Sequence, residues 1–255
     1  METTATVCKE MKVNLGSAFE KRGYDYLRSF VPLNEIKNFQ DALELLFLNN
    51  SADSKNIYEA AVNLDKNNKE ALYKIYQIAP KLREFSRLKE YFFKHLEEIF
   101  PGRNYVDLGS GVLFGLPQDQ RLTWTWHQES TYHPGIENIV HYWIPLFNPS
   151  STNNGAMSVL EGTHKLGSLP YNALKPFENG GTSLIPKNID ELVKNFKEEN
   201  FEINIGDAAF FHKELVHRSN YNASDKTRFT LVYRLAAIDS LPEQHEFSTL
   251  VAQTK

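Results

Sequence analysis

The spacing of apolar residues along the chain changes near residue 100. Before that point, apolar residues recur every three or four positions, which is the spacing of one buried face of an α-helix. The recurrence is clearest over residues 36–46 and 85–99. A third segment, KEALYKIYQIA (69–79), stops at Pro80, which cannot continue a helix. The pattern therefore predicts a helical N-terminal region that ends at Pro101-Gly102.

From about residue 104 the chain reads as short strands rich in β-branched and aromatic residues, separated by turn sequences. The strand candidates are VDLGSGVLFG (106–115), RLTWTW (121–126), IVHYWIPLF (139–147), AMSVL (156–160), FEINI (201–205), AAFF (208–211) and RFTLVYRL (228–235). One short helix is expected around IDELVKNF. Many short strands without regular strand–helix alternation predict a mainly β fold, a sandwich or barrel. We expect one integrated domain, with a helical region (1–103) packing on a β core (104–255).

Composition narrows the possible partners. The chain has 255 residues, 41% of them hydrophobic and 24% charged, and a net charge of −4 without any polybasic block. Nucleic acid is therefore not an expected partner. The single Cys8 allows neither an internal disulfide nor a cysteine-based zinc site. No apolar run approaches a membrane span or signal peptide, so we expect a cytoplasmic protein without a membrane partner. The sequence does not decide whether the protein is a monomer or a homodimer.

The segment WHQES (126–130) carries the first candidate chemistry. On a strand, residues two apart face the same side, so His127 and Glu129 would converge on one point. Two histidines and one carboxylate on one face form the ligand set of a mononuclear iron site with open positions for oxygen chemistry. A second histidine has to come from another segment. GDAAFFHKELVHRSNYNASDKTR (206–228) offers two competing candidates, His212 and His217.

Four features in order carry a resemblance to a known family. They are WHQES, NNGAMSVLEGTHKLG, GDAAFFHKELVHRS and an arginine, Arg228, eleven residues beyond His217. Over residues 105–235 the chain resembles the phytanoyl-CoA dioxygenase family. These are iron(II)- and 2-oxoglutarate-dependent oxygenases built on a double-stranded β-helix, a jelly-roll core like that of cupins.

The resemblance implies roles for five residues. It makes His127, Glu129 and His217 the iron ligands, and it makes Arg228 the residue that holds the distal carboxylate of 2-oxoglutarate, with Ser219 helping. A guanidinium matches a carboxylate with two parallel hydrogen bonds, which agrees with the role of Arg228. The family usually has aspartate at the acid position, whereas this chain has a side chain one methylene longer.

The implied activity is hydroxylation of a C–H bond in a small-molecule metabolite. O₂ is consumed, and 2-oxoglutarate is converted to succinate and CO₂. Two other functions are compatible with the ligand set: a cupin-like metal-dependent isomerase or hydrolase, and an inactive binding protein on the same fold. The isomerase or hydrolase needs no arginine that grips a dicarboxylate, so Arg228 argues against it. The intact set of metal ligands argues against the inactive binding protein.

Several other residues could line or support the site. Four other histidines of the β region are expected to be structural, to support the metal ligands, or to contact substrate. They are His133, His141, His164 and His212. Asn154 is mainly a turn residue. Alternation along HYWIPL puts Tyr142 and Trp143 on opposite faces, so only one can face the cavity. Arg234 shares a strand face with Arg228, and the sequence does not assign its role.

Overall fold

The computed structural model describes residues 16–120, 123–174 and 182–241, so Cys8 lies outside the described residues. Its α-helices are α1 (Gly16–Arg22), α2 (Leu33–Leu48), α3 (Ile57–Asn67), α4 (Lys69–Ile78), α5 (Arg83–Ile99) and α6 (Ile189–Asn195). The helices predicted over 36–46, 69–79, 85–99 and IDELVKNF are all present. Among the described residues, no helix combines the length and apolar character needed to cross a membrane.

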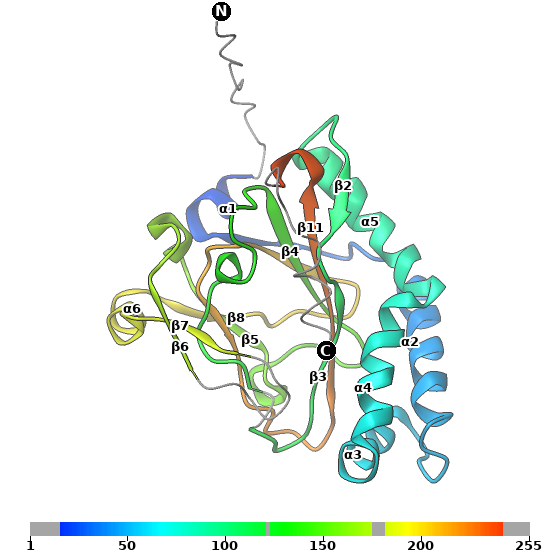
Figure 1. The fold of residues 1–255 in the computed structure, drawn as a ribbon. Helices are drawn as coiled ribbons and strands as arrows, with labels where there is room; N and C mark the ends of the chain where they lie inside the picture. Colours follow the sequence, from blue (N-terminus) through cyan, green and yellow to red (C-terminus); the bar gives the residue numbers. More distant parts are fainter. Residues whose placement is uncertain (1–15, 121–122, 175–181, 242–255) are drawn as a thin grey trace, which may run out of the picture.

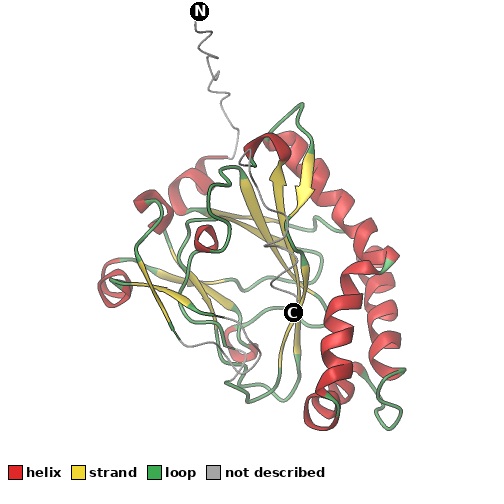
Figure 2. Ribbon diagram, in the orientation of Figure 1, coloured by secondary structure: helices red, strands yellow, loops and turns green. Residues whose placement is uncertain are grey.

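The strands are β1 (Tyr24–Leu27), β2 (Tyr105–Asp107), β3 (Gly111–Gly115), β4 (Ile139–Pro145), β5 (Met157–Leu160), β6 (Tyr171–Ala173), β7 (Leu184–Pro186), β8 (Glu198–Asn200), β9 (Ala208–His212), β10 (His217–Ser219) and β11 (Arg228–Ala237). A six-stranded sheet has the order β1-β9-β4-β11-β2, and β3 also pairs with β11. A three-stranded sheet has the order β10-β5-β8, and β6 pairs with β7. Every pair is antiparallel, and Figure 2 shows the two larger sheets facing each other.

The helices α2 to α5 cover the outer face of the six-stranded sheet (Figure 1). Phe92 of α5 shows how they attach, because its ring centroid lies 4.8 Å from that of Tyr142 and 4.9 Å from that of Tyr233. Alternate residues of β4 and β11 point the other way, toward the smaller sheet. Trp143 is one of these and packs in an inner cluster with Met157, whereas Tyr142 faces the helices. The predicted opposition of the two aromatic residues is confirmed.

Three local predictions differ from the structure. The N-terminal region is not purely helical, because β1 joins the edge of the large sheet beside β9. Residues 201–205 are not a strand, although Phe201 and Ile203 are buried, because their backbone groups bond to separate partners, Met157 and Ser150. Residues 123–126 of the predicted strand RLTWTW are also irregular, and its first two residues lie outside the described ones.

Candidate functional site

The segment that carries His127 and Glu129 is a strand only at its start. His127 forms a two-way backbone bridge with His217, with N···O distances of 2.9 and 3.0 Å. The chain then turns into a 3₁₀-helix at Glu129–Thr131, where Ser130 donates its amide to the carbonyl of Lys213. The predicted strand over WHQES is therefore wrong beyond residue 127. The turn nevertheless brings both side chains to the same point.

His127, Glu129 and His217 meet in the interior, between the two larger sheets. All three are buried, and one potential ligand atom from each lies within 4.8 Å of the others. The two imidazole centroids are 4.1 Å apart, and Glu129 Oε1 lies 3.8 Å from His217 Nε2. The structure thus gathers the three residues that the resemblance named as iron ligands.

Backbone carbonyls fix the orientation of both imidazoles. Nδ1 of His127 lies 2.7 Å from the carbonyl oxygen of Thr125, and Nδ1 of His217 lies 2.8 Å from that of Leu215. A carbonyl can only accept, so each Nδ1 carries the proton and each Nε2 keeps its lone pair. This arrangement is typical of metal-binding histidines, because the second hydrogen bond fixes the tautomer and raises the basicity of the ligating nitrogen. Burial, and then the neighbouring His217, lower the pKa of His127 to about 3.

The competing histidine, His212, points away from this site. It lies on β9, and its ring packs at 6.2 Å from Phe19 of α1 and at 5.4 Å from His164. Its neighbour Phe211 points inward and lies 4.9 Å from His217. Strand alternation therefore separates the two candidates for the third position, and only His217 lies beside His127 and Glu129.

The second carboxylate oxygen of Glu129 has its own set of neighbours. Oε2 lies 3.5 Å from Nε of Arg234, 3.7 Å from Nε2 of His141 and 3.9 Å from Nε2 of His133. Burial alone would raise the pKa of Glu129, but Arg234, His141 and His217 outweigh it and hold that pKa well below its usual value. Glu129 is therefore an anion that presents Oε1 to His217 and Oε2 to Arg234 and the two other imidazoles.

Arg228 is a buried cation with no carboxylate partner among the described residues. Only 9% of the residue is exposed, and no described residue accepts a hydrogen bond from its Nε or Nη1. Burial lowers its pKa to about 10, which still leaves it charged near neutral pH. A charge in this position is costly unless an anion joins it, so the guanidinium fits a ligand carboxylate.

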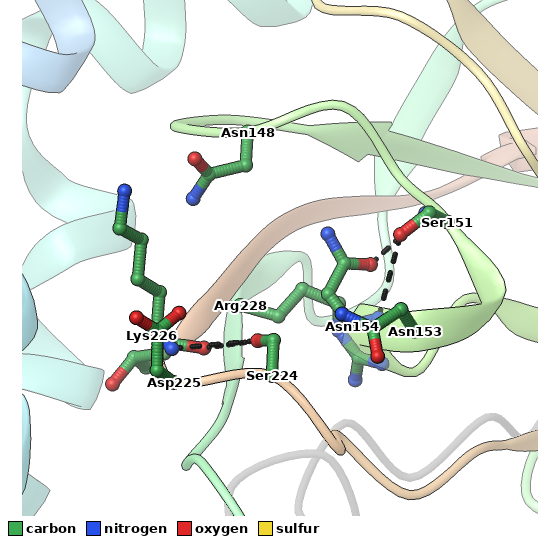
Figure 3. Close-up of a pocket in the computed structure, with 9 residues that line it drawn as sticks. Asn148, Ser151, Asn153, Asn154, Ser224, Asp225, Lys226 and Arg228 are labelled. Carbon is green, nitrogen blue, oxygen red and sulfur yellow. Dashed lines mark hydrogen bonds between the residues drawn. The ribbon is translucent and has the colours of Figure 1, made fainter.

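Two glycines make room for this guanidinium. A Cβ at Gly115 would lie 3.3 Å from Nη2 of Arg228, and one at Gly155 would lie 2.8 Å from Nη1. A cavity of about 130 Å³ adjoins Arg228 and is lined by polar residues of the 148–154 and 224–227 segments (Figure 3). Asn154 is used within its own turn, where its side chain accepts from the Ser151 amide.

A model of the family described as phytanoyl-CoA dioxygenase (PhyH) matches residues 19–230. This chain belongs to the phytanoyl-CoA dioxygenase family. The resemblance seen in the sequence is thereby confirmed. The family consists of iron(II)- and 2-oxoglutarate-dependent dioxygenases, so the expected metal and cosubstrate are those of the family. The histidine pair and the carboxylate fit the metal, and Arg228, whose Nε and Nη1 have no acceptor in the part of the chain that the structure describes, fits the cosubstrate.

Two sequence relatives agree with this membership. The chain is 26% identical over 232 residues to the peroxisomal phytanoyl-CoA dioxygenase of Homo sapiens. This match covers 87% of this chain and 67% of the human protein. It is 28% identical over 163 residues to the Bos taurus protein, covering 60% and 48%. The chain therefore spans about two thirds of the human relative and half of the bovine one.

Similar folds occur in enzymes of low sequence identity. The α-ketoglutarate-dependent carbocyclase SnoK from nogalamycin biosynthesis has a TM-score of 0.60 at 16% identity, with 92% of this chain and 90% of that chain covered. EctD from S. alaskensis, solved with 2-oxoglutarate and 5-hydroxyectoine, has a TM-score of 0.56 at 17% identity, with 90% and 78% covered. At these identities the likeness concerns the fold.

Proposed function

We propose that the protein hydroxylates a C–H bond of a small-molecule metabolite, with iron(II) as the metal and 2-oxoglutarate as cosubstrate. The observation that carries this proposal is the pairing of two features in one interior: a buried His–Glu–His set and a buried arginine without a described acceptor. We further infer that the six- and three-stranded sheets are the two halves of a double-stranded β-helix. The helical region before residue 104 would pack on it as part of one domain.

In this proposal, Nε2 of His127, Nε2 of His217 and the carboxylate of Glu129 hold the metal. Iron(II) held there would supply the O₂ chemistry by which 2-oxoglutarate is converted to succinate and CO₂ while one oxygen atom is inserted into the substrate. Arg228 binds the distal carboxylate of 2-oxoglutarate through its guanidinium fork. Ser219 lies two residues beyond His217 on β10, and its assistance to Arg228 stays a prediction.

Other residues of the chain shape the space around the metal site. The rings of Trp124 and Tyr132 each lie 5.9 Å from the ring of His127. They form an aromatic wall that would keep bulk water from the reacting groups and orient a small substrate. A cytoplasmic location and a monomeric or dimeric state also stay predictions.

The alternatives from the sequence gain no support from a specific contact. An isomerase or hydrolase on the same ligand set has no use for a cation buried at Arg228, because its reaction needs no dicarboxylate cosubstrate. An inactive binding protein would be under no requirement to hold both Nε2 atoms toward one carboxylate. The oxygenase uses both features.

The test is a screen for succinate release. The purified protein is incubated with iron(II), 2-oxoglutarate, O₂ and a panel of small metabolites, and succinate is quantified with and without a chelator. We expect succinate formation that requires both iron(II) and 2-oxoglutarate and rises with a metabolite that is itself oxidised. The His127→Ala variant should be inactive. Succinate release that persists in this variant, or that does not need added iron, would contradict the proposal.

A further inference from the structure

A second arginine lies on the same strand face as Arg228, at the opposite end of the site. Arg234 is six residues farther along β11, and its cross-strand partner on β4 is His141. Its Nε lies 3.5 Å from Glu129 Oε2, and its Nη1 donates to the carbonyl of Gly109 at 2.9 Å. The side chain is 20% exposed, so it is largely desolvated yet can still be reached by a ligand.

The positive charge of Arg234 is balanced by the negative charge of Glu129. A metal dication bound to Glu129 would be partly neutralised by that same carboxylate, which would then no longer balance Arg234. 2-Oxoglutarate is a dianion, and Arg228 pairs with one of its carboxylates. The dication, Glu129, the dianion and Arg228 together are neutral. Arg234 then remains as one unmatched, largely buried cation, an arrangement that favours the entry of an anion.

The neighbouring His141 adds a possible donor on this side of the site. It is fully buried, and neither of its ring nitrogens has a hydrogen-bond partner among the described residues. Near Arg234, Glu129 is the acidic group to which the described ion pairs connect it.

A second metal is a poorer occupant of this position. Glu129, His133 and His141 do place potential ligand atoms within 4.8 Å of one another. Their shared oxygen, however, is the one that Arg234 approaches to 3.5 Å. A dication there would repel the guanidinium and would share a single carboxylate with the iron. An anion is attracted by the same guanidinium and can accept a hydrogen bond from the neighbouring His141.

We propose that Arg234, with His141 beside it, binds a carboxylate of the primary substrate. The inference rests on the proposed function and assigns its substrate class, a small carboxylic acid. Arg228 and Arg234 would then divide the anions between them, the first holding the cosubstrate and the second the substrate. An acid anchored at Arg234 places its carbon chain beside the metal ligands, where a C–H bond has to lie.

The test uses the anaerobic complex of the protein with iron(II) and saturating 2-oxoglutarate. Such a complex has a weak charge-transfer band in the visible, which changes when a molecule binds beside the metal. The complex is titrated with straight-chain monocarboxylates from acetate to decanoate and with the matching primary amides. We expect the acids to change the band of the parent protein at concentrations about 10- to 100-fold lower than the amides do, because a charge-assisted pair is lost with the amide.

Two variants give the comparison. Arg234→Gln should remove the preference for acids over amides. Arg103→Gln, which breaks a peripheral ion pair with Asp239, should retain the preference. Arg234→Lys keeps the charge and should retain part of it.

A parent protein that binds acids no better than amides would overturn the inference, and so would an Arg234→Gln variant with an unchanged preference. Loss of the band itself in Arg234→Gln would show that Arg234 serves Glu129 instead, and would also overturn it. An absent band in the parent would contradict the proposed function, and this inference with it. A band that is present but indifferent to carboxylates contradicts this inference alone.

Discussion

Replacing Arg228 with methionine should have opposite effects on stability and on cosubstrate binding. The guanidinium is buried, and its Nε and Nη1 have no acceptor among the described residues. Methionine keeps an unbranched apolar stem and removes the charge. The protein without ligands should therefore become more stable, although the site loses its dicarboxylate anchor.

The size of the effect follows from the desolvation of the charge. Burial lowers the pKa of Arg228 from 12.5 to about 10. A shift of this size corresponds to roughly 3 kcal/mol between the charged and neutral forms. Lost packing against Gly115 and Gly155 offsets part of it, so we expect a net gain of about 1–3 kcal/mol. For a chain of this length, each kcal/mol raises Tm by about 2–4 °C.

Thermal unfolding measures both effects in one assay. The parent and Arg228→Met are compared without ligands, with manganese(II) alone, and with manganese(II) plus 2-oxoglutarate, and the effect of the cosubstrate is taken relative to manganese(II) alone. The cosubstrate should raise the Tm of the parent by mass action and leave that of the variant unchanged. Arg103→Met is the matched control, because Arg103 lies in a peripheral ion pair with Asp239 at 3.5 Å. A variant that is less stable without ligands, or that still responds to 2-oxoglutarate, would refute the reasoning.

Three further predictions concern the scaffold. Gly155→Ala should destabilise the protein by about 2 kcal/mol or more, because φ of Gly155 is +80° and a Cβ would lie 2.6 Å from the backbone oxygen of Asn220. It should also weaken 2-oxoglutarate binding, because the same Cβ would lie 2.8 Å from Nη1 of Arg228. Gly102→Ala, with φ of +72° and open space around its Cβ, should cost less in denaturant titrations. Phe92→Ala should cost about 3–5 kcal/mol in one cooperative unfolding transition, because its fully buried ring joins the helices to the sheet; separate transitions would argue against a single domain. Burial lowers the pKa of His95 to about 4, so the folded state keeps this ring neutral and stability falls as the pH drops from 6.5 toward 4. His95→Gln should remove up to about 3 kcal/mol of that acid sensitivity, as judged by unfolding at several pH values; an unchanged pH dependence would contradict the assignment.

Short-range patterns predicted the helices well. The apolar spacing of residues 85–99 maps directly onto the buried face of α5, because a helix is determined by neighbours within four residues. The same holds for the opposition of Tyr142 and Trp143, which follows from strand alternation alone. The ordered motifs around His127 and His217 identified the family, and the structure brings these two residues into backbone contact.

The features that the sequence did not predict depend on pairing between distant segments. Arg234 and His141 are 93 positions apart, and their meeting at Glu129 results from the β4–β11 register. β1 is a strand only because β9 offers it an edge. The turn at Glu129–Thr131 likewise depends on the carbonyl of Lys213, which a local pattern does not reveal. Register of this kind is set by the whole sheet.

The central claim is that His127, Glu129 and His217 hold iron(II). The two histidines of the consecutive strands β9 and β10, His212 and His217, test it most directly. Anaerobic titration of iron(II) into the protein with 2-oxoglutarate is followed by the visible charge-transfer band, for the parent, His217→Ala and His212→Ala. Both histidines are largely buried, but only His217 lies beside Glu129. We predict that His217→Ala abolishes the band while His212→Ala retains it. A band that survives in His217→Ala and disappears in His212→Ala would contradict the account.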